Sequence, residues 1–167
     1  MNTRAFHARV VPLSIAVLSL ALAGGLAAAD PAPASGAAKG TFAQKGEKAV
    51  ELTNAAAFVD QQDDRKPSIV IISDKKIPLE SWTSEFDLIG AKDKLAFTGI
   101  VIFIDKDGSV YRTDMYWKGT QTSVSGVFDV KIDSAAGAKD ITGSAKTSSG
   151  DDPDSPMLDV KFHATLK

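Results

Sequence analysis

The sequence predicts a mainly β fold: a single antiparallel β-barrel or β-sandwich of about seven or eight strands with one short helix. Apolar and polar residues alternate in several short segments, as they do in half-buried strands. Gly, Pro and Asp clusters separate these segments at fairly regular intervals. One segment alone repeats its apolar residues at helical spacing. This pattern is typical of barrels and sandwiches alike and leaves the choice between them open.

The N-terminal segment is predicted to be a secretory signal peptide covering residues 1–29. Two arginines precede an apolar stretch, Val10–Ala23, and Ala27 and Ala29 supply the small residues that a cleavage site requires. The apolar stretch is shorter than the roughly 20 residues of a membrane-spanning helix. We therefore expect an exported protein, periplasmic or extracellular, with no stable membrane anchor after cleavage.

Residues 30–40, with the sequence DPAPASGAAKG, are predicted to be a disordered tether because they offer little to pack. Residues 41–167 then have the size of a single domain, which we expect to be the β-domain. The chain contains no cysteine. Disulfides, thiolate metal sites and cysteine nucleophiles are therefore excluded.

The first strands are predicted at 41–44 and 47–53, with 55–59 as a continuation. Four consecutive β-branched residues within Ser68–Ser73 indicate a strand buried on both faces. The helix is predicted over Leu79–Ile89, where Trp82, Phe86 and Ile89 fall on one face and Gly90 follows as a terminator.

A hairpin is the clearest local prediction. Strands at Leu95–Ile104 and Ser109–Trp117 flank the turn Asp105–Gly108. Pairing Asp105 with Ser109 fixes which residues of the two strands lie opposite each other. This register sets Val110, Arg112, Asp114 and Tyr116 against Ile100, Ile102 and Ile104.

The remaining strands are predicted along the C-terminal third. One covers Val124–Ile132 with a bulge at Gly126, and a weaker one covers Lys139–Thr147. A polar loop, Ser148–Pro156, precedes a final strand in which apolar residues at 160, 162, 164 and 166 alternate with polar ones. His163 belongs to the polar set and is expected to face solvent.

The candidate ligand-binding residues are Arg112, Asp114, Tyr116 and Trp117. An Arg and an Asp beside isoleucines indicate a partly buried ion pair, a polar patch in a ligand pocket, or surface groups at a sheet edge. A large aromatic side chain such as Trp117 stacks on sugars when exposed and belongs to the core when it points inward.

Weak candidates for a Ca²⁺ site are Asp151, Asp152 and Asp154, because oxygen-rich loops bind this ion. The Asp105–Gly108 segment resembles part of an EF-hand loop, but Phe103 occupies a ligand position. We therefore interpret it as a turn. No resident cofactor is predicted.

The catalytic inventory is small. His163 is the only histidine beyond the predicted signal peptide, and neither G-x-S-x-G nor H-E-x-x-H occurs. A formal net charge of −2 and a pI of about 5.6 give no basic footprint for nucleic acid.

Three segments carry a resemblance: LTNAAAFVDQ at 52–61, KPSIVIISDKKIPLESW at 66–82, and WKGTQTSVSGVFD at 117–129. They resemble small exported bacterial β-domain proteins, a group without an assigned activity. The resemblance implies export and a β fold, and it implies no site residue.

The sequence as a whole favours an exported, non-enzymatic β-domain that binds a small ligand, a glycan or an envelope protein. The alternative is a hydrolase that works with carboxylates alone on an envelope or extracellular substrate. That alternative requires two Asp or Glu side chains to converge in one cleft within about 5–10 Å.

Overall fold

The computed structural model describes residues 31–124, 126–148 and 155–167. The predicted signal peptide and the Asp151, Asp152 and Asp154 group lie outside these residues. The described parts of the chain form nine strands and one helix. In order they are β1 (Ala37–Ala43), β2 (Val50–Val59), β3 (Ser68–Ser73), α1 (Glu85–Leu95), β4 (Gly99–Ile104), β5 (Val110–Trp117), β6 (Thr120–Val124), β7 (Phe128–Ile132), β8 (Asp140–Thr147) and β9 (Met157–Thr165).

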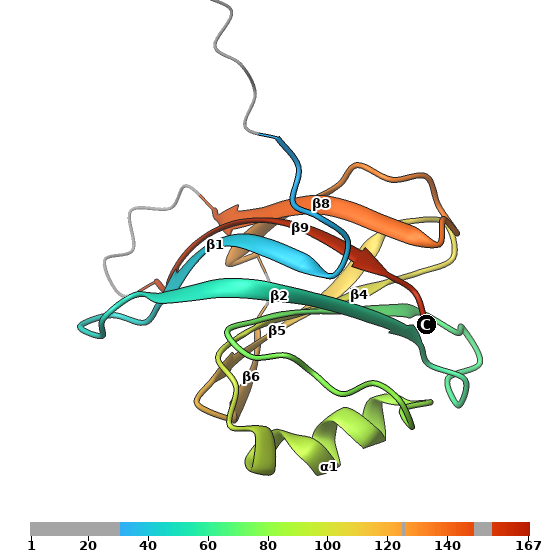
Figure 1. The fold of residues 1–167 in the computed structure, drawn as a ribbon, viewed down its shortest axis with the longest axis horizontal. Coiled ribbons are helices and arrows are strands. Elements are labelled where there is room, and N and C mark those ends of the chain that lie inside the picture. Colours follow the sequence, from blue (N-terminus) through green and yellow to red (C-terminus); the bar gives the residue numbers. More distant parts are fainter. Residues whose placement is uncertain (1–30, 125, 149–154) are drawn as a thin grey trace, which may run out of the picture. The chain divides into compact units, whose positions relative to one another are not determined.

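All nine strands belong to one antiparallel sheet in the order β6-β5-β4-β3-β2-β1-β9-β8-β7. The first and last strands of this order, β6 and β7, are separated by only three residues in the chain. Their adjoining ends can therefore be at most about 14 Å apart. The sheet consequently curls into a half-barrel (Figure 1), and its two edge strands, β6 and β7, do not pair with each other. The predicted mainly β class is confirmed, with nine strands in place of seven or eight.

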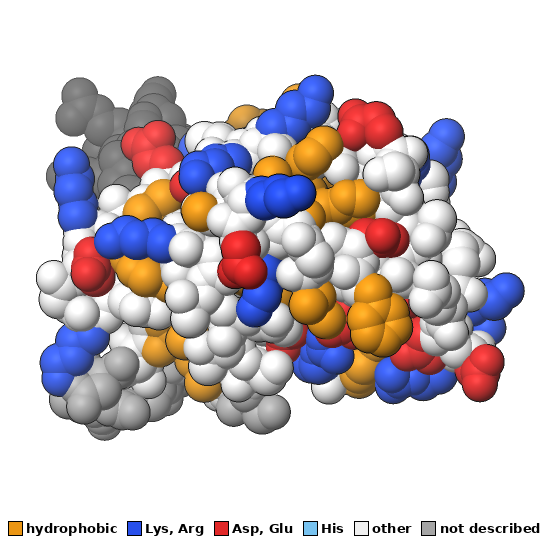
Figure 2. Space-filling model, turned by 90° about the horizontal axis from the view of Figure 1, so that it is seen from below, with side chains coloured by type: hydrophobic (Ala, Val, Ile, Leu, Met, Phe, Trp, Pro, Cys, Tyr) orange, Lys and Arg blue, Asp and Glu red, His pale blue; other side chains and the backbone are white. Residues whose placement is uncertain are grey.

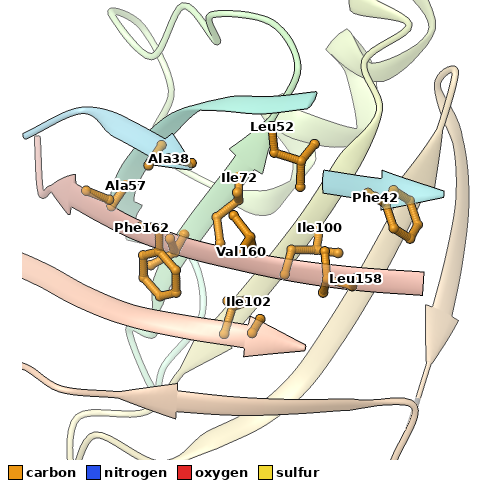
Figure 3. Packing of buried hydrophobic residues seen from close by; sticks show 14 of the residues in the cluster. Ala38, Phe42, Leu52, Ala57, Ile72, Ile100, Ile102, Leu158, Val160 and Phe162 are labelled. Carbon is orange, nitrogen blue, oxygen red and sulfur yellow. The ribbon is translucent and has the colours of Figure 1, made fainter. Parts of the chain in front are cut away.

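The inner face of the curled sheet is filled by apolar side chains. Residues of the neighbouring strands β3 and β4, such as Ile72 and Ile102, point toward Val160 on β9, which lies three strands away from β3 in the sheet order (Figure 3). Phe42 and Phe162 are at most 1% exposed among them. This packed interior supplies the main hydrophobic stabilisation of a chain that has no disulfide.

The outer face carries a second apolar cluster beneath α1 and the segment that leads into it. Phe97, Phe103, Ile71, Leu88 and Tyr116 are its central members. Seen from this side, basic and acidic side chains are interspersed over the surface (Figure 2). Within the described residues, no helix combines the length and the apolar character that crossing a bilayer demands.

The helix lies six residues later than the sequence predicts. Ser84 is the N-cap, and the Asp87 carboxylate accepts hydrogen bonds from the backbone N–H groups of Thr83 and Ser84 at 2.7 and 2.9 Å. The helix ends at Leu95 and not at Gly90, and its C-cap residue is Ala96, whose φ is +42°. Capping chemistry therefore sets the start of the helix, and the apolar spacing that predicted Leu79–Ile89 is misleading.

The predicted apolar face of the helix is also wrong. Phe86 and Ile89 are 72% and 38% exposed, and Leu88 is the buried residue of α1. Trp82 precedes the helix and packs edge to face on Phe58, with ring centroids 5.9 Å apart.

A β-bulge corrects the predicted hairpin register. Asp105 and Ser109 are bonded as predicted, and Ile104 pairs with Val110, but Phe103 then pairs with Arg112. The extra residue on β5 is Tyr111. A shift of one residue moves every following side chain to the other face.

Two further boundaries differ from the predictions. Residues 37–40, assigned to the tether by composition, belong to β1, which pairs with β2 on one side and β9 on the other. The single strand predicted over Val124–Ile132 is two strands at opposite edges of the sheet. The position that suggested a bulge, Gly126, lies in the connection between them, where its φ is +69°.

Candidate functional site

The bulge gathers a group of polar side chains on the outer face, beside the N-terminal end of α1. This polar cluster consists of Glu85, Arg112, Asp114, Tyr116 and Gln121. Glu85 is the first residue of the helix, and its backbone N–H donates to the Asp60 carboxylate at 2.9 Å. This bond ties the helix start to the end of β2, while Arg112, Asp114 and Tyr116 lie on β5 and Gln121 lies on β6.

Arg112 is the centre of the polar cluster. Its Nη2 atom donates to Oε1 of Glu85 and, at 3.0 Å, to Oδ2 of Asp114. The guanidinium also lies over the ring of Phe103, with 3.6 Å between its central carbon and the ring centroid. Partial burial acts to lower the pKa of Arg112, but the bond to Glu85 and the charge of Asp114 outweigh it and raise that pKa.

Asp114 is completely buried, and its Oδ2 atom accepts a second hydrogen bond from Nε2 of Gln121 at 2.9 Å. Tyr116, also completely buried, stacks on Phe97 with ring centroids 4.6 Å apart. Burial raises the pKa of Tyr116, and the charges of Asp114 and Glu85 raise it further.

Some of the hydrogen-bonding capacity of the polar cluster is not used. Arg112 Nε, Asp114 Oδ1 and Tyr116 OH are buried and have no hydrogen-bond partner in the described parts of the chain. Each buried polar atom without a partner lowers the stability of the fold. The ion pairs of Arg112 and the apolar packing around the polar cluster offset this cost.

Glu85 and Asp114 show the convergence of carboxylates that a carboxylate hydrolase requires. Both bind the same nitrogen of Arg112, however, and Asp114 has no exposed surface. A carboxylate that is paired with a guanidinium and closed to water cannot reach a substrate. The geometry is that of a partly buried ion-pair network that fastens α1 to the sheet, with Asp114 as its buried member.

Trp117, the fourth predicted ligand residue, does not belong to the polar cluster. Consecutive side chains of a strand point to opposite faces, so Trp117 lies on the inner face. Its ring contacts Phe42 edge to face at 5.6 Å between centroids, and 9% of the residue is exposed. The tryptophan is therefore part of the core and offers no platform for a sugar.

His163 is half-buried, not solvent-facing as predicted. One ring nitrogen lies 3.3 Å from the Asp140 carboxylate, and the other lies 3.3 Å from the carbonyl oxygen of Pro33. Both nitrogens are thus engaged. Hydrogen bonds from Thr165 and then His163 lower the pKa of Asp140. The group ties the start of the described chain to β8 and β9.

The acidic residues near Asp60 do not form a metal site either. Asp60 Oδ1 accepts from the backbone N–H groups of Gln62 and Asp63, and Asp63 pairs with Arg65. In the described residues, no group of three or more His, Asp or Glu side chains could hold a metal ion.

A different feature, which the sequence does not predict, lies at one end of the curled sheet. It is an apolar notch of about 270 Å³, formed where several strands begin or end. The apolar side chains that line it are Val59, Ile104, Ile132, Ile141 and Leu166, together with the alanines 135, 136 and 138 of the β7–β8 loop.

Backbone contacts define the walls of the notch. Leu166 N–H donates to Lys139 O at 2.8 Å, and Lys167 N–H donates to Ala57 O at 3.1 Å, so the chain beyond β9 crosses toward β2. On the other side the β4–β5 turn touches the β7–β8 loop. A Cβ on Gly108, whose φ is +88°, would lie only 3.3 Å from the Cβ of Ala136.

Charged residues at the notch are confined to three positions: Lys66, Asp105 and Lys106. Both lysines are exposed at its rim, and Asp105 is half-buried. Each apolar lining residue stands near a strand end that looks unremarkable in the sequence. Only the sheet order brings these ends together, so the pattern of the chain contains no signal for them.

Comparisons with protein-family models, with curated proteins and with solved structures found no match to this chain.

Proposed function

We propose that this chain is an exported, non-enzymatic binding protein, and that it holds a small apolar molecule in the notch. The observation that supports the ligand is the notch itself, a hollow at one end of the sheet whose walls are mostly apolar side chains. Ligand sites are typically concave and mostly apolar, with a few polar groups at defined positions. The notch has this composition.

The size of the notch limits the ligand. A cavity of about 150 Å³ holds benzene, and one water molecule occupies about 30 Å³ of liquid. At that density, 270 Å³ corresponds to roughly nine non-hydrogen atoms. A single short chain or a single ring fits, whereas an oligosaccharide does not.

The apolar part of the proposal is tested with octan-1-ol, a neutral molecule of suitable size, added to isotope-labelled protein. We expect shifts of the backbone amide signals from Ile104, Ile132 and the β7–β8 loop. Ala138→Phe, which adds a ring to the wall of the notch, should abolish these shifts. Ala91→Phe, on α1, is the matched control and should retain them. Shifts that survive in the Ala138→Phe protein would place the ligand elsewhere.

Export rests on the sequence of residues 1–29 alone and has its own test. The native protein should be recovered from the periplasm or the culture medium with Asp30 as its first residue, as determined by mass spectrometry. Recovery of the intact N-terminus from the cytoplasm would contradict export and leave the notch unaffected.

A further inference from the structure

The charges at the rim of the notch carry the inference further, and this step rests on the proposed function. We propose that the ligand is an amphiphilic anion: a medium-chain carboxylate whose apolar tail fills the notch and whose head group is bound by Lys66 and Lys106.

The first observation is the net charge of the residues that line the notch. Two lysines and one aspartate line the notch, which leaves an excess of one positive charge.

The second observation is that the two lysines have no opposite charge of their own. Among the described lysines, Lys118 pairs with Glu47 and Lys131 with Asp133, whereas Lys161 forms no ion pair, and the lysines at the notch are of this second kind. Within the described residues, neither the Lys66 nor the Lys106 ammonium group forms such an ion pair. Each is thus available to an anion that arrives from solution.

The third observation is the backbone at Lys66, which has a φ of +48°. This left-handed conformation costs a side-chain-bearing residue of order 1 kcal/mol and is normally left to Gly or Asn. The bend is held by the hydrogen bond from Lys66 N–H to Asp63 O at 2.8 Å and by the fixed φ of Pro67. Lys66 therefore lies, at a conformational cost, where the chain turns over the rim.

Together these features match a molecule with one charged end. An apolar tail gains free energy by leaving water, at about 0.8 kcal/mol per buried methylene. A carboxylate cannot enter an apolar hollow without a large desolvation cost, so it stays at the rim, where ammonium groups meet it. A molecule with a cationic head would meet the excess positive charge and be disfavoured.

The test compares two ligands of equal chain length, octanoate and octan-1-ol, by titration calorimetry at low ionic strength. Octanoate should bind more tightly. Exposed ion pairs contribute up to about 1 kcal/mol, so Lys66→Gln and Lys106→Gln should each weaken octanoate about two- to fivefold. Both variants should leave octan-1-ol unchanged, and Asp105→Asn should strengthen octanoate.

Lys161→Gln is the matched control, since Lys161 is an exposed lysine on β9 outside the lining of the notch. It should alter neither affinity, and added salt should reduce the preference for octanoate over octan-1-ol. Equal binding of the two ligands, or a loss of affinity for both in the lysine variants, would overturn the carboxylate inference and leave the apolar site standing. Failure of both ligands to bind would overturn the proposed function as well.

Discussion

The polar cluster beneath α1 and the apolar notch at the sheet end use charge in opposite ways. In the polar cluster, Asp114 is fully buried and its charge meets Arg112 directly. At the notch, Lys66 and Lys106 stand in solvent beside an apolar hollow. Charged residues lie beside apolar side chains in both places, but the Asp114 carboxylate is buried, whereas both lysines are exposed.

Under the proposed function, the two places differ in whether the charged group already has a partner within the protein. Arg112 connects Asp114 on the sheet with Glu85 on α1 through hydrogen bonds to both carboxylates. Lys66 and Lys106 contribute nothing comparable to the fold. Removing a member of the polar cluster should therefore affect stability, and removing a rim lysine should affect binding.

The largest expected effect is that of Asp114→Ala. The substitution leaves Arg112 and Gln121 without their shared acceptor and opens a cavity next to Tyr116. Breaking a buried pair in this way costs about 3 kcal/mol or more of unfolding free energy. Urea unfolding measures the loss, and octan-1-ol binding below the transition should be unchanged.

Asp159→Ala is the control for this substitution, since Asp159 is exposed on β9. Its effect should stay within about 0.5 kcal/mol, as for most surface substitutions. Asp114→Asn keeps an acceptor for Gln121. Its loss of unfolding free energy should therefore lie between the losses for Asp114→Ala and Asp159→Ala. A cost below 1 kcal/mol for Asp114→Ala would remove the structural role of the polar cluster.

A smaller effect is expected from the apolar side of α1. Leu88 is completely buried, and truncation of a buried leucine to alanine costs about 2–5 kcal/mol. We expect the lower end, because a surface helix can settle onto the sheet after the side chain is shortened. Phe86→Ala, on the exposed face, should cost less than about 0.5 kcal/mol.

This pair of variants compares the two helix faces directly. The face that apolar spacing predicts contains Phe86, and the face that packs in the structure contains Leu88. Chemical denaturation followed by circular dichroism gives both values. A larger loss for Phe86→Ala than for Leu88→Ala would mean that α1 sits on the sheet with the predicted face.

The strands were predictable from the sequence where alternation is clean. β3, β8 and β9 lie where their patterns place them, because each has one buried face or two. The turn at Asp105–Gly108 follows equally from its residues. The helix was not predictable from apolar spacing, since the capping pair Ser84 and Asp87 decided its start.

The sites were predictable only in part. The sequence singles out Arg112 and Asp114, and the structure brings them together, but on the face opposite to the one expected. The single extra residue in the bulge causes this, and no turn signal marks Tyr111. The notch was not predictable because its residues share only a position at strand ends, which depends on a sheet order that closes β1 onto β9.

The last expected effect is absent at neutral pH and appears only at alkaline pH. It tests whether water reaches the polar cluster. The chain has two tyrosines, and burial is the main cause that raises the pKa of each. For Tyr111 the positive charge of Arg65 opposes this rise, whereas for Tyr116 the charges of Asp114 and Glu85 add to it. Tyr111 should therefore ionise first, above the usual value of about 10.

Tyr116 should ionise only as the protein unfolds, and Tyr111→Phe isolates its signal in the tyrosinate absorbance. Above pH 10 the unfolded chain releases a proton that the folded chain still holds at Tyr116, so stability falls as pH rises. Below pH 10 the folded and the unfolded chain both hold that proton, so the free energy of unfolding no longer changes with pH through Tyr116. Ionisation of Tyr116 while the far-ultraviolet circular dichroism stays native would show that water reaches the polar cluster, and the contrast with the open notch would then be lost.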